Sequence, residues 1–183
     1  KELEILRECG RKLARILEEI KKEVRPGIST KDLDNLGERL ILDSGGDPVF
    51  KGYRALASEK PYPCSLCVSI NDEVVHAIPS NSRILKEGDI VGLDIGMRHP
   101  SKTGLITDMT ITIGVGDISR KAKLLIEATS GSLDKGIAVL RPGIHLGDLG
   151  SVIQEYIERL GFGVVRELAG HGVGRELHEE PFV

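Results

Sequence analysis

The sequence lacks the features that mark several large classes of protein. No apolar run among its 183 residues approaches the ~20 that a membrane-spanning helix needs. The formal net charge is only -3, so no excess of one sign points to nucleic acid or to a membrane surface. The N-terminus, Lys1 to Arg7, has no signal-peptide layout and does not begin with Met, so we expect the natural start to be missing.

Cysteine is also scarce. An odd count of three argues against a disulfide framework, so we expect a reducing compartment, the cytoplasm. Cys64 and Cys67 form a C-x-x-C pair, but no second pair completes a zinc site and no thioredoxin-like βαβ pattern surrounds it. Redox chemistry and zinc binding stay open, although two small side chains that line a core or pocket are favoured.

The composition that is present is typical of a globular protein, with 40% hydrophobic and 29% charged residues. Apolar residues recur at spacings of three and four from Leu6 to Val24, which predicts a helix that Arg25-Pro26-Gly27 stops. Ser29 or Thr30 then caps a second predicted helix. Residues 65–78 are predicted as a strand region, and a turn at 84–89 leads into the next strand.

A short motif is repeated along the chain. Val24–Ile28 recurs as Leu140–Ile144, 116 residues later (140 minus 24), and a helical stretch precedes and follows each copy. This pattern predicts an internal duplication, in which one domain contains two related helix-helix-strand halves. A second half as long as the first would extend well past Val183, so we expect the chain to lack roughly the last fifth of the fold.

Two aspartates occupy the middle of neighbouring predicted strands. In Ile90–Ile95 the odd positions are apolar and Asp94 lies on the other face, and in Thr107–Ile113 Asp108 likewise lies opposite an apolar face. Residues 97–104 are predicted to form the hairpin loop, and antiparallel pairing would bring both carboxylates to one surface.

These aspartates favour a divalent metal site. Aspartate is a poor strand former, and burial of two like charges is unfavourable unless a cation neutralises them. Aspartates that simply face solvent remain the alternative.

Histidines on other segments are candidate partners. His171 lies among glycines in residues 169–174, where a ligand can approach closely, although a lone histidine in such a turn more often binds no metal. His178 follows seven residues later and could hydrogen-bond a reacting group, and His76 is predicted at a strand end. Gly170–Gly174 reads G-x-G-x-G, which does not fit a dinucleotide-binding motif.

Taken together, these segments resemble the type I methionine aminopeptidases of the pita-bread (creatinase/aminopeptidase) family. The resemblance covers essentially the whole chain and is strongest in Val68–Pro79, Leu85–Gly96, Thr107–Thr110 and Gly170–Pro181. It implies an α+β pita-bread fold with a pseudo-twofold duplication, here a single catalytic domain over residues 1–183 whose second half is truncated. It also implies an enzyme that removes the N-terminal methionine from nascent polypeptides.

The resemblance gives a metal-binding role to three residues: Asp94, Asp108 and His171. It implies two divalent ions in the complete enzyme, and oxygen-rich ligation with one imidazole suits Co, Mn, Fe or Zn. The family uses two further glutamates, which would follow Val183. We therefore expect weak or partial metal occupancy and little or no activity in this chain.

The substrate-binding residues that the resemblance implies are His76, His178, Tyr62 and Cys67. His178 would contact the scissile carbonyl and His76 the amino-terminal end of the substrate, and both count as catalytic. Tyr62 and Cys67 would line the pocket for the methionine side chain, where Leu177 replaces a common Phe and softens the wall. The implied partners are the N-terminal peptides of nascent proteins and the ribosome, and uncovered sheet edges predict self-association.

Two other functions stay open. A non-catalytic pita-bread module or inactive relic would bind proteins or peptides, but its metal ligands would have decayed, whereas here all three candidates are present. Xaa-Pro aminopeptidases and prolidases share the fold and ligands. They usually carry an additional N-terminal domain, whereas the first predicted helix here starts almost at residue 1.

Overall fold

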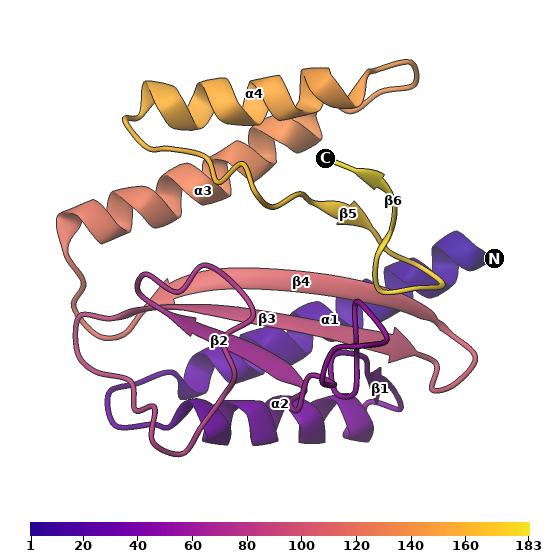
Figure 1. The fold of residues 1–183 in the computed structure, drawn as a ribbon, viewed down its shortest axis with the longest axis vertical. Coiled ribbons are helices and arrows are strands. Elements are labelled where there is room, and N and C mark those ends of the chain that lie inside the picture. The colour runs from indigo at the N-terminus through magenta and orange to yellow at the C-terminus, as the bar shows by residue number, and fades with distance from the viewer. The chain divides into compact units, whose positions relative to one another are not determined.

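The computed structural model describes residues 1–183 and divides into two compact units (Figure 1). The first unit comprises residues 1–118 and 173–179, and the second comprises 119–172 and 180–183. The elements in chain order are α1 (Glu2–Glu23), α2 (Thr30–Asp43), β1 (Asp47–Pro48), β2 (Leu66–Ile70), β3 (Ile90–His99), β4 (Leu105–Gly114), α3 (Arg120–Val139), α4 (Leu146–Arg159), β5 (His171–Gly172) and β6 (Glu179–Phe182). No helix is both long enough and apolar enough to cross a membrane.

An antiparallel sheet around β3 forms the framework of the first unit. β1 and β2 share one edge of β3, and β4 pairs along the other edge over the full length of the strand. Helices α1 and α2 lie against one face of this sheet (Figure 1). The opposite face, which we call the carboxylate face, carries Asp94 of β3 and Asp108 of β4.

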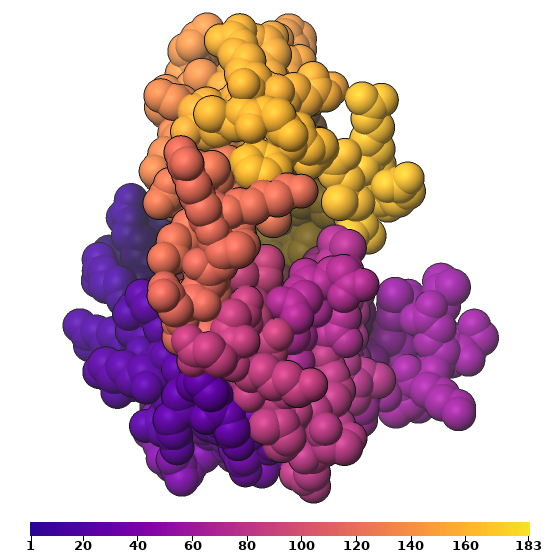
Figure 2. Space-filling view, turned by 90° about the vertical axis from the view of Figure 1, so that its left-hand side faces the viewer, coloured from indigo at the N-terminus to yellow at the C-terminus, as the bar shows by residue number.

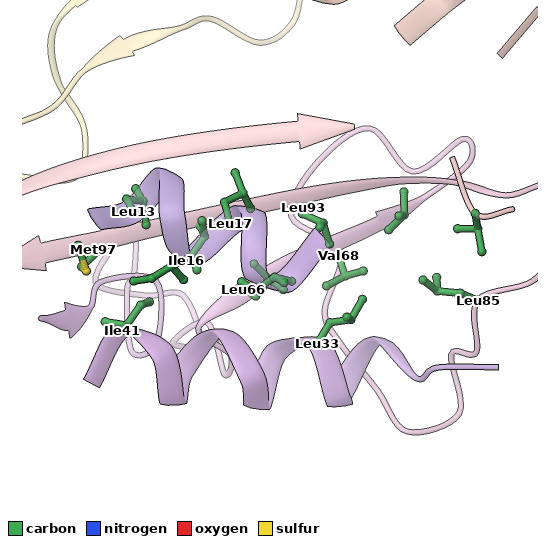
Figure 3. Close-up of a cluster of buried hydrophobic side chains, with 14 of the residues drawn as sticks. Leu13, Ile16, Leu17, Leu33, Ile41, Leu66, Val68, Leu85, Leu93 and Met97 are labelled. Carbon is green, nitrogen blue, oxygen red and sulfur yellow. The ribbon is translucent and has the colours of Figure 1, made fainter. Parts of the chain in front are cut away.

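The helix-covered face holds the main hydrophobic core (Figure 3). The three- and four-residue spacing in α1 gathers its apolar side chains on one side, and strand alternation does the same for β2 and β3. Each large aliphatic side chain buried there contributes about 1.5–3 kcal/mol to stability. The fully buried members include Leu13, Leu17, Ile20, Leu33, Ile41, Leu66, Val68, Val91, Leu93, Ile95 and Met97.

Two expectations from the sequence were wrong. The predicted strand region 65–78 is a strand only over Leu66–Ile70, because Asn71 and His76 have φ angles of 56° and 60°, which a continuous strand does not accommodate. His76 therefore lies in a loop and not at a strand end. The hairpin loop is also shorter than 97–104, since the register pairs Met97 and His99 with residues of β4.

A buried carboxylate joins α2 to β2. Asp34 is completely buried, and its Oδ1 accepts hydrogen bonds from the backbone N–H groups of Ser65 (2.8 Å) and Leu66 (3.0 Å). Lys31 Nζ lies 2.6 Å from the other carboxylate oxygen, so the buried charge is paired. Because Asp34 satisfies the donors at the start of β2, it fixes where that strand enters the sheet.

The repeated motif has the same backbone conformation in both copies. Gly27 and Gly143, at equivalent positions, have φ angles of 90° and 87°, which only glycine adopts readily. Each lies between two helices, α1 and α2 in the first unit and α3 and α4 in the second.

The helix that follows each glycine also begins in the same way. The N-cap residues Ser29 and His145 have φ, ψ angles of -82°, 150° and -86°, 146°. A side-chain oxygen three residues later, on Asp32 and on Asp148, accepts from the N-cap N–H at 3.3 Å in both copies. This agreement supports the predicted duplication.

In the second unit, small residues of α3 allow α4 to approach closely. A Cβ added at Gly131 would lie 2.5 Å from the hydroxyl of Tyr156, and one at Gly136 would lie 3.1 Å from Leu149. β5 and β6 form a separate two-stranded sheet. Next to it, Gly170 and Val183 exchange backbone hydrogen bonds of 2.8 and 2.9 Å.

Candidate active site

The two aspartates predicted as metal ligands are diagonal neighbours on the carboxylate face. The register pairs Asp94 with Thr110 and Asp108 with Gly96, so both side chains project from the same side of the β3–β4 pair. Thr110 Oγ1 donates a hydrogen bond of 2.8 Å to Asp94 Oδ1. The antiparallel pairing predicted for these strands is confirmed, and neither aspartate is fully exposed.

Asp108 has an unusual protonation equilibrium. Burial, followed by the negative charge of Asp94 and a hydrogen bond between the two side chains, raises the pKa of Asp108 from 3.8 to about 7. Two carboxylates this close resist simultaneous ionisation. A divalent cation bound between them would neutralise both charges, and hard oxygen donors are the ligands that such cations prefer. The pair therefore fits a divalent metal, although no third His, Cys, Asp or Glu of the first unit joins it in a group able to hold an ion.

A second apolar cluster lies on the same face of the sheet. We call it the Phe50 cluster; its buried members are Phe50, Cys67, Ile106 and Leu177, and Val49, Tyr53 and Tyr62 pack against it. Cys67 is the direct cross-strand partner of Asp94, so the cluster adjoins the carboxylates. Gly96 makes room for it, because a Cβ there would lie 2.7 Å from the ring of Phe50.

Tyr62 and Cys67, predicted as pocket residues, both belong to this cluster. The hydroxyl of Tyr62 donates to backbone carbonyls 3.2 Å away at Leu66 and Ala77. Burial, together with the negative charges of Asp94 and Asp108, raises the pKa of the Cys67 thiol to about 12. Cys67 is therefore a neutral, unreactive thiol. This supports a small apolar wall and not a redox pair, and Cys64 instead points toward Lys31, 3.9 Å from its Nζ.

His178 is carried by residues 173–179, which belong to the first unit. The backbone N–H of Ile106 donates to Gly174 O over 2.7 Å and thereby attaches this segment to β4. Leu177 is only 5% exposed and fills part of the Phe50 cluster. The residue before His178 therefore packs in the same cluster as Cys67 and Tyr62, the two predicted pocket residues.

Tyr53 contacts His178 and was not predicted from the sequence. Its hydroxyl lies 2.5 Å from His178 Nδ1, and the two ring centroids are 5.1 Å apart. A signal was present, because three of the six Tyr and Phe residues of the chain fall within residues 50–62. In a protein with so few aromatic residues, such a concentration indicates a special surface.

His76 lies in the loop after β2 and is exposed. The neighbouring Ala77 O accepts hydrogen bonds from Val68 N (3.1 Å) and from Tyr62 (3.2 Å), so the loop returns to β2 beside the Phe50 cluster. His171 belongs to the second unit, where its Nδ1 lies 3.1 Å from Gly172 O. The substrate role of His76 and the metal role of His171 stay predictions.

Comparison with known proteins places the chain in a family. The model of metallopeptidase family M24 matches residues 4–183. The chain belongs to metallopeptidase family M24. Membership of this family implies the use of divalent metal.

Relatives named methionine aminopeptidase match almost the entire chain. Methionine aminopeptidase 1 of Bacillus subtilis is 47% identical over 181 residues, which are 99% of this chain and 69% of the relative. The crystal structure of a methionine aminopeptidase from Thermotoga maritima matches with a TM-score of 0.91 at 39% identity. The match covers 99% of this chain and 69% of the Thermotoga chain.

The fold extends beyond these relatives. A prolidase from Pyrococcus furiosus has a TM-score of 0.82 at 22% identity, with 99% of this chain and 50% of the prolidase covered. At this identity the likeness concerns the fold alone. The predicted α+β pita-bread fold is confirmed, and M24 membership with methionine aminopeptidase relatives confirms the predicted family.

Proposed function

We propose that this chain carries the catalytic face of a metal-dependent aminopeptidase that removes the N-terminal methionine from nascent polypeptides. The observation that carries the proposal is the diagonal pair Asp94 and Asp108 next to the Phe50 cluster, because it combines a cation-demanding carboxylate pair with a compact apolar surface. The similarity to relatives named methionine aminopeptidase supports the same activity.

Asp94 and Asp108 would hold the divalent ions, with His171 as the proposed imidazole ligand. Oxygen donors and one imidazole suit Co, Mn, Fe or Zn. Divalent ions held by these residues would supply Lewis-acid chemistry, which activates water at neutral pH and polarises a carbonyl group. Since the 183 residues offer three candidate ligands, we expect weak or partial occupancy and low activity in this polypeptide.

The remaining residues would bind and orient the peptide. Cys67, Tyr62 and Leu177 would surround the unbranched methionine side chain, which a small apolar wall accepts better than a charged or branched one. His178 would donate a hydrogen bond to the scissile carbonyl oxygen, where negative charge develops during the reaction. His76 would lie near the free amino group.

We also propose that residues 1–183 act as one catalytic domain in the cytoplasm and meet their substrates as chains leave the ribosome. Association with the ribosome rests on the family resemblance alone. Self-association would follow from exposed apolar side chains, among them Leu133, Ile137 and Leu140.

Peptide cleavage tests the proposed function. The polypeptide and the product of the complete gene are incubated with Mn²⁺ or Co²⁺ and with Met-Ala-Ser, N-acetylated Met-Ala-Ser or an Ala-Pro peptide. We expect metal-dependent release of methionine from the free peptide only, and a loss of at least ~100-fold in kcat/KM for Asp94→Asn and Asp108→Asn. Asp72→Asn, in an exposed loop, is the matched control.

Two results would contradict the proposal. Preferential cleavage of the Ala-Pro peptide favours a prolidase-type enzyme. Absence of metal-dependent cleavage by the complete gene product favours a binding module. Calorimetric titration of the polypeptide with Mn²⁺ tests the occupancy separately, since tight binding of two ions is incompatible with the weak occupancy that we expect.

A further inference from the structure

We propose that Tyr53 is a positioning residue for His178. Its hydroxyl donates a hydrogen bond to Nδ1 and so keeps the proton of the neutral imidazole on Nε2. The inference rests on the proposed function, in which His178 contacts the scissile carbonyl. Neither the hydrogen bond nor the protonation state is implied by the family resemblance.

The two side chains are in direct contact. Tyr53 Oη lies 2.5 Å from His178 Nδ1, within hydrogen-bonding range. The rings are tilted by 52° with centroids 5.1 Å apart, a separation typical of packed aromatic pairs. The hydrogen bond and the ring packing together restrict rotation of the imidazole about its χ2 angle.

The backbone of Tyr53 is fixed independently of His178. Its N–H donates to Phe50 O (2.9 Å), and its carbonyl accepts from Tyr62 N (2.8 Å). Gly52 N also donates to Tyr62 O over 2.8 Å, so these bonds close the base of the exposed segment 54–61. That segment projects from the surface (magenta-purple in Figure 2), whereas the Tyr53 ring packs against the Phe50 cluster.

The backbone of His178 is fixed as well. The preceding Leu177 is buried in the Phe50 cluster. On the other side, a carboxylate oxygen of Glu179 accepts from the N–H groups of Arg175 (2.6 Å) and Glu176 (2.7 Å), which folds the segment back on itself. Two separately anchored backbones, 125 residues apart in sequence, therefore bring the phenol to Nδ1.

The direction of this hydrogen bond decides which chemistry His178 can perform. A neutral imidazole has one N–H donor and one acceptor nitrogen. A phenol O–H is a stronger donor than the N–H of neutral imidazole, so Tyr53 donates and Nδ1 accepts. The proton then resides on Nε2, and this nitrogen can donate to an oxygen that gains negative charge. In the opposite tautomer, Nε2 would present a lone pair to that oxygen and repel it.

Nitrogen-15 NMR of the histidine side chains tests the hydrogen bond without any need for activity. The spectra are recorded with Zn²⁺, because Mn²⁺ and Co²⁺ broaden nearby signals, and the His178 signals are assigned with His178→Gln. We expect the Nε2–H tautomer in the wild type and a mixture of both tautomers in Tyr53→Phe. Tyr62→Phe is the matched control for this measurement, since its hydroxyl bonds backbone carbonyls and not His178. An Nδ1–H tautomer in the wild type, or an unchanged spectrum in Tyr53→Phe, overturns the inference.

Kinetics of the complete gene product test the consequence. Because Tyr53→Phe keeps the ring, we expect a fall in kcat of about 5- to 20-fold with KM changed less than about twofold. Tyr156→Phe, in the second unit between α3 and α4, should keep the wild-type kcat. Equal kcat values in Tyr53→Phe and the wild type would refute the positioning role. Failure of every protein to cleave Met-Ala-Ser, with the expected NMR spectra, would refute the proposed function but leave the hydrogen bond established.

Discussion

Asp108→Asn is expected to stabilise the metal-free protein at pH 8, although it removes a proposed metal ligand. Burial and the charge of Asp94 raise the pKa of Asp108 from 3.8 to about 7. At pH values between these two pKa values, Asp108 keeps its proton in the folded chain but has released it in the unfolded chain. The free energy of unfolding therefore falls as pH rises from about 4 to about 7, and the full penalty is present above that window. Asparagine has the same shape and no charge, so it avoids the penalty.

The size of the effect follows from the two pKa values. They differ by about 3, and one pKa unit corresponds to about 1.4 kcal/mol, so the upper limit is ~4 kcal/mol. Asp108 is only half-buried, and solvent screens part of the repulsion. We therefore expect Asp108→Asn to raise the free energy of unfolding by ~1–2 kcal/mol at pH 8 and to change it little near pH 4.

Urea unfolding at pH 5, 6, 7 and 8 in the presence of EDTA measures this difference. Asp72→Asn, in an exposed loop, controls for the loss of one negative charge. With excess Mn²⁺ at pH 8, the wild type should become more stable than Asp108→Asn, because a cation stabilises two ionised carboxylates but not one carboxylate and an amide. The reasoning is refuted if, in EDTA, the free energy of unfolding of the wild type rises between pH 5 and 7 relative to that of Asp108→Asn.

Three further predictions concern the residues around the site. Asp34→Ala should lower the free energy of unfolding by ~2–4 kcal/mol in urea, because it leaves two buried N–H groups at the start of β2 without an acceptor. Gly96→Ala should destabilise by ~1–3 kcal/mol, because its Cβ would lie 2.7 Å from the ring of Phe50. Gly92 lies on the same strand and face, but a Cβ there would have no atom closer than 3.8 Å, so Gly92→Ala should change the free energy of unfolding little. Equal destabilisation by Gly92→Ala and Gly96→Ala would contradict this account. Since burial raises the pKa of Cys67 to about 12, iodoacetamide at pH 8 should alkylate it far more slowly than in urea-unfolded protein, as mass spectrometry of the modified peptide can show.

Local patterns in the sequence predicted the elements that position the carboxylates. The helical spacing from Leu6 to Val24 and the alternation in β3 and β4 are direct consequences of backbone geometry, so they can be recognised without knowledge of the partner elements. The repeat at Val24–Ile28 also predicted matching helices, which the structure contains. The proposed roles of His76, His171 and His178 came from family resemblance and not from such patterns.

Features that depend on distant contacts were not predictable in this way. Asp34 is one of three aspartates in α2, and only the packing of β2 against α2 shows that it is buried. Tyr53 meets His178 across 125 residues of sequence. The loop that carries His76 was read as part of the strand region 65–78, yet positive φ angles at Asn71 and His76 redirect the chain.

The late return of residues 173–179 to the first unit constrains how the chain matures during translation. The last strand of the sheet in the first unit, β4, ends at Gly114. Leu177, which packs against Phe50 and Ile106, is synthesised about 70 residues after Ile106. A growing chain therefore presents Phe50 and Ile106 uncovered for several seconds at ordinary elongation rates. During that interval we expect molecular chaperones to recognise this part of the sheet.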